Sequence, residues 1–277
     1  MSKTLAEALR TRQDDRAALL ARITRMLEGD DRVAAAWLFG SLGRGGEDDW
    51  SDIDIFVAVA DADFSGVSQG RRAFTARVGE PLIVVEAPSC APPSGAFLTV
   101  CYDSPSGLLI VDWYWQPQSL ARVWRPTRLL FDRVGLPHWD GPGGWELGQT
   151  PERTWQEQAE REVNALWWGL AHSAKYLARS PLTWEVEGRM SSQRQELEDA
   201  YRFFGEPPPD LRDWAWPQRP EGKVELLRRL AALAEALTPS IRKQGISIRP
   251  AVTPSLGRLL GVVELACRGA TLGRIST

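Results

Sequence analysis

The chain has 277 residues, of which 43% are hydrophobic and 25% charged, and its net charge is −3. This composition is typical of a soluble globular protein, and the lack of a basic excess argues against a nucleic-acid partner. No apolar run is long enough to span a membrane, and no signal peptide is evident. The three cysteines, Cys90, Cys101 and Cys267, lack metal-ligand spacing and indicate reduced thiols. We therefore expect a cytoplasmic protein.

The first half of the chain alternates helical and strand patterns. Apolar residues from Leu5 to Leu27 recur at helical spacing, which predicts an amphipathic helix that ends at Gly29. A second helix is expected over Phe64–Val78, and a short one after Gln118. Apolar runs predict strands at Val33–Phe39, Ile53–Val59, Leu82–Glu86, Ala96–Asp103, Gly107–Gln116 and Arg128–Phe131. We therefore expect an N-terminal α/β domain with a mixed sheet over residues 1–135.

Two acids open the second of these strands. Side chains alternate along a strand, so Asp52 and Asp54 leave on one face while Ile53 and Ile55 leave on the other, toward a core. Two adjacent carboxylates repel each other unless a cation lies between them. The pair is therefore a candidate magnesium site.

The turn before these acids is rich in glycine. It supplies residues that allow positive φ, a hydroxyl group and a cation: Gly40, Gly43, Gly45, Gly46, Ser41 and Arg44. Backbone N–H groups in such a turn can form an anion-binding nest. A phosphate cradle beside paired carboxylates suits metal-assisted phosphoryl or nucleotidyl transfer.

A third acid lies inside the strongest strand pattern of the chain. Asp112 is the one charged residue in the run Leu108–Trp115, and a lone buried carboxylate is costly unless it is paired or binds a cation. We interpret Asp112 as the third carboxylate of the site. Glu86, at the end of another strand, is the alternative.

These residues carry a family resemblance. Gly40-Ser41, ten residues and then Asp52-Ile53-Asp54 resemble the signature of the DNA polymerase β-like nucleotidyltransferases. The resemblance implies a small α/β catalytic domain joined to a helical partner, two Mg²⁺ ions and ATP as co-substrate. By the same resemblance the acids Asp52, Asp54 and Asp112 are expected to bind metal and carry catalysis. The nucleotide is expected at Gly40, Ser41, Arg44 and Ser51.

The second half of the chain has helical patterns. Residues 136–149 are rich in Gly and Pro and are expected to form a linker. Thr150 and Pro151 suggest a helix start. Helices are predicted over Pro151–Arg179, Trp184–Phe204, Val224–Leu237 and Pro254–Cys267. They predict an α-helical bundle domain over residues 150–277, so the fold class is α+β.

One face of the first of these helices holds a second motif. Helical spacing places Asn164, Trp168, Ala171 and Lys175 on that face. Asn164-Ala165-Leu166-Trp167-Trp168, followed by Lys175, resembles the helical domain of aminoglycoside adenylyltransferases of the streptomycin-modifying type, although relatives often have Glu at the position of Ala165. The resemblance implies that Lys175 reaches the nucleotide phosphates. Acceptor recognition is expected from acids and an aromatic ring on this helix: Glu157, Glu160, Glu162 and Trp168.

The expected reaction is transfer of AMP from ATP to a hydroxyl of a small cationic acceptor, with an aminoglycoside as the first candidate, by a monomer or homodimer. Asp112 could act as a metal ligand or take the acceptor proton directly. Three alternatives stay open: transfer to a protein, transfer to tRNA, and a non-catalytic nucleotide-binding module.

Overall fold

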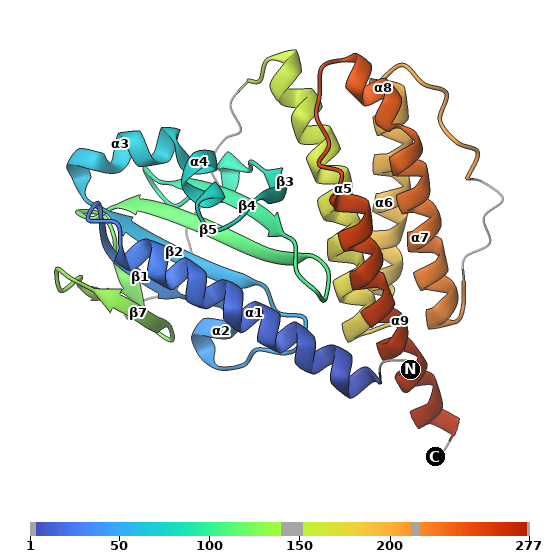
Figure 1. The fold of residues 1–277 in the computed structure, drawn as a ribbon, viewed down its shortest axis with the longest axis horizontal. Coiled ribbons are helices and arrows are strands. Elements are labelled where there is room, and N and C mark those ends of the chain that lie inside the picture. The colour runs from blue at the N-terminus through green and yellow to red at the C-terminus, as the bar shows by residue number, and fades with distance from the viewer. Residues whose placement is uncertain (1–3, 140–151, 212–216, 276–277) are drawn as a thin grey trace. The chain divides into compact units, whose positions relative to one another are not determined.

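The computed structural model describes residues 4–139, 152–211 and 217–275 (Figure 1). Their contacts divide the chain into two compact units. The helical unit takes the described residues of Met1–Arg12, Asp103–Leu108 and Arg153–Thr277, and the sheet unit takes those of Gln13–Tyr102 and Leu109–Glu152. A mixed sheet is followed by helices, so the predicted α+β class is confirmed. In the described ranges, no helix is both long and apolar enough to cross a membrane.

The sheet unit is built on six strands in the order β3-β4-β5-β2-β1-β7. Their bounds are Val33–Leu38 (β1), Ile53–Val59 (β2), Pro81–Val85 (β3), Ala96–Tyr102 (β4), Leu109–Pro117 (β5) and Arg128–Asp132 (β7). β2 and β5 run parallel, whereas the other neighbouring pairs are antiparallel. A short 3₁₀ helix, η1 (Pro88–Cys90), lies between β3 and β4. The predicted strands and the mixed sheet are thus present.

Helices α1 (Leu5–Glu28), α3 (Asp61–Gln69) and α4 (Arg71–Ala76) pack on one face of the sheet. Leu19 and Ile23 of α1 and Phe74 of α4 are buried there against apolar side chains of β2, β4 and β5. The single helix expected over Phe64–Val78 is instead two helices. Gly70, whose N–H closes α3 on the Gly66 carbonyl, separates them, because glycine is a poor residue for a helix interior.

A smaller aromatic cluster lies on the opposite face of the sheet. Trp37 and Phe56 stack at 4.5 Å, and Phe39 meets Tyr114 edge to face at 4.8 Å. The segment after Gln118, which was expected to be helical, contains strand β6 (Val123–Trp124), paired in parallel with β8 (His138–Trp139). β8 falls at the start of the predicted linker; residues 140–149 of that linker lie outside the described part of the chain.

The helical unit contains α5 (Trp155–Arg179), α6 (Trp184–Phe203), α7 (Pro220–Ala236), α8 (Thr238–Lys243) and α9 (Val252–Ile275). α5 begins later than predicted, because Thr154 and Glu157 form a capping box there. The expected cap at Thr150 and Pro151 lies outside the described residues. Proline at the first helical position starts α7.

The four long helices α5, α6, α7 and α9 run side by side as a bundle (Figure 1). Leu166 and Leu170 of α5, Leu230 of α7 and Val263 of α9 are among its buried residues. The predicted C-terminal helical bundle is therefore present. Residues 103–108 also belong to this unit: Gly107 has φ +99° and lies so close to α9 that a Cβ there would come within 2.4 Å of a backbone nitrogen.

Candidate active site

Asp54 and Asp112 are direct partners across the parallel strands β2 and β5. The flanking residues Ile53 and Ile55 are buried in the helix-covered core, so Asp54 leaves on the opposite face. The same alternation on β5 buries Val111 and Trp113 and places Asp112 on the face of Asp54. Side chains of directly paired residues on one face are neighbours. Two of the three predicted acids therefore lie next to each other.

Asp112 also has a neighbour on its other side. Thr99 of β4 is its antiparallel partner, and the Thr99 hydroxyl donates a hydrogen bond of 2.6 Å to Asp112 Oδ1. Thr99 is 4% exposed. This buried donor fixes the orientation of the carboxylate.

The three acids share an environment with Tyr114, two residues after Asp112 on the same face of β5. Burial raises the pKa of the Tyr114 hydroxyl, and nearby negative charges raise it further. These charges include the carboxylates of Asp112, Asp54 and Asp52. All three predicted acids thus lie within electrostatic reach of one buried phenol.

The glycine-rich turn reaches the same place. Gly40 begins a short helix, α2 (Gly40–Arg44), with φ +62°. A Cβ on Gly40 would lie 2.0 Å from Asp54 Oδ2, so the backbone of this turn touches the carboxylate. Gly45 takes the left-handed conformation that ends α2. The expected open turn is therefore a short helix, whose first N–H groups have no partner within the helix.

The other residues expected to bind nucleotide differ in their setting. Ser41 follows Gly40 in α2, and Arg44 is exposed at the end of that helix. Ser51 is 5% exposed and its hydroxyl accepts from the backbone of Asp48 and donates to the Asp48 carboxylate. Arg16 of α1 binds the carbonyls of the same turn, at 2.6 Å for Asp48. Through these hydrogen bonds Ser51 stabilises the turn that precedes Asp52.

Glu86, the alternative third acid, is paired with arginines. Its carboxylate pairs with Arg71 and, at 2.6 Å, with Arg72, both of α4. Burial alone would raise the pKa of Glu86, but the hydrogen bonds and charges of the two arginines lower it. Glu86 is thus occupied by a helix on the other face of the sheet, and the geometry favours Asp112 as the third acid.

The donor chemistry of the site suits Mg²⁺, which prefers carboxylate oxygens. In the part of the chain that the structure describes, no three His, Cys, Asp or Glu side chains are grouped closely enough to hold a metal ion as they stand. What the structure shows is the Asp54–Asp112 pair, with Asp52 at the start of β2.

The predicted residues of the helical unit lie on α5. Lys175 is 4% exposed, and its ammonium lies 5.5 Å from the centre of the Tyr176 ring. Trp168 is half-buried and stacks on His172 at 4.6 Å. Asn164 donates to the Glu160 carbonyl one turn earlier, at 2.7 Å.

The three glutamates expected to recognise an acceptor have different roles. Glu157 is exposed and occupied in the capping box with Thr154. Glu162 accepts hydrogen bonds from Gln158 and, at 3.1 Å, from Arg161. Glu160 is half-buried on the same helix. The capping role of Glu157 was readable in the sequence, since Thr followed three residues later by Glu is a helix-start signal.

Sequence reasoning missed Thr99 and Tyr114. Thr99 is the one hydroxyl residue in the apolar stretch Phe97–Cys101, which was a usable signal. Tyr114 gave none, because it sits in a run of aromatic residues where a core position is the natural interpretation.

Residues 21–78 match a protein-family model, described as polymerase beta, nucleotidyltransferase. The match supports a relationship with the DNA polymerase β-like superfamily, and nucleotidyltransferase activity in general. The matched segment runs from within α1 to just beyond α4, so it includes α2, Asp52 and Asp54 but not Asp112. No curated protein gives a significant match to the chain.

Proposed function

We propose that this chain transfers AMP from ATP to a hydroxyl of a small cationic acceptor, with an aminoglycoside as the first candidate. The observation that carries the proposal is the Asp54–Asp112 pair beside the Gly40 backbone of α2. Carboxylates next to the N–H groups at a helix start are the parts that nucleotidyl transfer requires. The family match over residues 21–78 supports the same chemistry.

The triphosphate would bind at the start of α2. The backbone of Gly40 and the hydroxyl of Ser41 would contact its oxygens, and Arg44 would neutralise part of its charge. Lys175, on α5, is the further cation proposed to reach the phosphates. Ser51 would contribute indirectly, by holding the turn that positions Asp52.

The carboxylates of Asp52, Asp54 and Asp112 would hold Mg²⁺, and we propose that the site takes two ions. When bound, the metal neutralises charge on the phosphates and lowers the pKa of the acceptor hydroxyl. The Thr99 hydroxyl holds Asp112 Oδ1 in a hydrogen bond. Asp112 would bind metal or accept the proton of the acceptor hydroxyl.

The acceptor would be recognised by α5. Trp168 offers an aromatic face for a cation, and Glu160 and Glu162 offer negative charge. Glu157 is the least suited of the predicted acids, because its carboxylate caps the helix. The cysteines of the described residues form no disulfide, which fits the proposal of a cytoplasmic enzyme. We propose that it acts as a monomer or homodimer.

The test is mass spectrometry of acceptors incubated with the protein, ATP and Mg²⁺. A panel of aminoglycosides, tRNA and lysate protein is compared, and pyrophosphate release is followed in parallel. An aminoglycoside that gains the mass of one AMP supports the proposal. Labelled nucleotide on tRNA or on a protein band, with no modified drug, would assign the site to another acceptor. Absence of pyrophosphate release with every acceptor would favour a non-catalytic module.

A further inference from the structure

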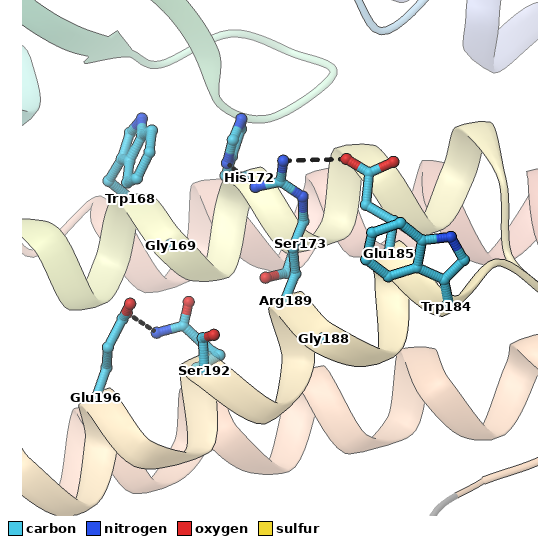
Figure 2. A pocket seen from close by; sticks show the side chains of 11 residues that line it. Trp168, Gly169, His172, Ser173, Trp184, Glu185, Gly188, Arg189, Ser192 and Glu196 are labelled. Atoms are coloured by element: carbon cyan, nitrogen blue, oxygen red, sulfur yellow. Dashed lines mark hydrogen bonds and ion pairs between the residues drawn. The ribbon is translucent and has the colours of Figure 1, made fainter.

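A pocket of about 480 Å³ opens between α5 and α6 within the helical unit (Figure 2). Its size falls in the range of small-molecule sites. Trp168 and His172 of α5 and Trp184, Arg189 and Glu196 of α6 are among the residues that line it. Of these, the proposed function uses only Trp168.

A glycine makes room for the acid of this pocket. A Cβ on Gly169 would lie 2.2 Å from Gln193 Oε1 and 3.0 Å from Glu196 Oε2, so both side chains lie directly over the α5 backbone. Gln193 is 2% exposed, and its amide donates to Glu196 Oε2 at 2.8 Å (Figure 2). The Glu196 carboxylate is thus held in place by a buried donor.

Arg189, at the other end of the pocket, already has an acidic partner. Arg189 binds Glu185 and His172 Nδ1, each at 3.2 Å, and its guanidinium lies 3.7 Å from the centre of the Tyr176 ring. Burial, followed by the charge of Lys175, lowers the pKa of His172 to about 3. His172 is therefore neutral at physiological pH and accepts from Arg189. Among the residues that line the pocket, the carboxylates Glu185 and Glu196 therefore outnumber the one guanidinium, Arg189, which favours a cationic ligand.

Glu196 has no ion-pair partner in the described part of the chain. Burial raises the pKa of the Glu196 carboxyl, and the charge of Glu162 raises it further, against the hydrogen bond from Gln193 and the charge of Arg161. Glu196 is nevertheless exposed, so a ligand can reach its carboxylate from solvent. A cationic ligand there would relieve this unfavourable electrostatic environment.

The pocket also offers aromatic surfaces. Trp168 is stacked on His172 along α5, with the two rings inclined by 21°. Trp184 is 84% exposed, whereas the next most exposed large hydrophobic residue of the described chain, Trp155, reaches 49%. Trp184 lies beside Glu185 and Arg189, whereas Trp168 is next to Gly169, over which the Glu196 carboxylate lies (Figure 2). Trp168 is therefore the ring nearer to Glu196, and aromatic faces attract organic cations.

We propose that the α5/α6 pocket binds an ammonium group of the acceptor, with Glu196 as its counter-ion and Trp168 as the aromatic surface beside it. The identification of the ligand as the acceptor rests on the proposed function. The chemical class, a small organic ammonium ion, rests on the carboxylate and the aromatic ring of the pocket alone.

The test measures binding by titration calorimetry on the full chain without nucleotide. The probe is 2-deoxystreptamine, a cyclitol with two ammonium groups, and the uncharged cyclitol myo-inositol is the matched control ligand. Glu196→Gln should weaken probe binding about tenfold or more, because a charge-assisted contact is lost. Trp168→Ala should weaken it several-fold. Asp199→Asn, which removes an exposed acid from the same helix, should bind like the wild type. Circular dichroism verifies that each variant is folded.

The inference is overturned if Glu196→Gln binds the probe like the wild type, or if myo-inositol binds as tightly as 2-deoxystreptamine. A failure of the proposed function can be distinguished from a failure of the pocket assignment. If Glu196→Gln loses probe binding but no compound in the panel gains AMP, the pocket stands and the reaction does not. If a drug gains AMP with an unchanged KM in Glu196→Gln, the reaction stands and the pocket assignment is wrong.

Discussion

Asp54 of β2 lies directly opposite Asp112 of β5, on the face of the sheet away from the helices α1, α3 and α4. Two like charges in direct register on neighbouring strands are unfavourable for the fold by themselves. Their placement between the buried Thr99 and the Gly40 backbone therefore points to a role in binding or catalysis.

The acids are tested by Asp54→Asn and Asp112→Asn. Each should reduce nucleotidyl transfer by about 100-fold or more, because carboxylate ligands and charge stabilisation are lost. Each should leave the melting temperature unchanged or raise it, because repulsion is relieved. Steady-state kinetics measure the loss of nucleotidyl transfer, and thermal melting of the same preparations measures the change in stability.

Glu86→Gln is the matched control for the third acid. It removes the ion pairs with Arg71 and Arg72, so the protein should lose about 1 kcal/mol of stability or less and keep its turnover. If Glu86→Gln lost turnover while Asp112→Asn kept it, our choice of third acid would be wrong.

Gly40→Ala tests the contact between α2 and Asp54. The added Cβ would meet the Asp54 carboxylate at 2.0 Å, and φ is +62°, so Asp54 must move. We expect kcat/KM to fall at least tenfold, as is usual when a catalytic group is displaced by about 1 Å. Gly46→Ala is the control, since a Cβ there meets nothing within 4 Å. Equal kinetics for the two variants would count against the arrangement.

Lys175→Met tests the proposed phosphate contact while it keeps the buried stem of the side chain. Binding of magnesium-ATP should weaken, with little change in melting temperature. Lys223→Met is the comparison: Lys223 is 1% exposed and binds the Pro181 carbonyl and Glu187. It should cost about 1–3 kcal/mol of stability and leave nucleotide affinity unchanged. The reverse pattern would make Lys175 a structural residue.

Asp30 gives a prediction on pH. Hydrogen bonds from Arg32 and Arg77 hold the pKa of this buried carboxyl well below its usual value, although burial opposes them. The stability that it contributes is present above about pH 4, the unfolded value, and is lost as the pH falls below that. Asp30→Asn should cost about 2 kcal/mol at pH 7 and flatten the acid branch of the stability curve. The exposed Asp31→Asn should keep that branch, as measured by urea melts across pH.

The sequence by itself determined the local features of this protein. Strand periodicity placed Asp54 on the face opposite Ile53 and Ile55, and helical spacing located α1 and the four long helices of the bundle. The spacing of Gly40-Ser41 and Asp52-Ile53-Asp54 was enough to show a resemblance to the DNA polymerase β-like nucleotidyltransferases, which the family match over residues 21–78 supports. These features depend on residues close together in the chain, where side-chain period and turn chemistry are decisive.

Only the tertiary structure decided which distant residues meet. The parallel register of β2 and β5 brings Asp112 to Asp54, and the packing of α4 commits Glu86 to Arg71 and Arg72. Likewise, the close approach of α5 and α6 at Gly169 creates a pocket from residues that no motif connects. Register and helix packing are set by the burial of whole apolar faces, a property of the assembled core that no short stretch of sequence contains.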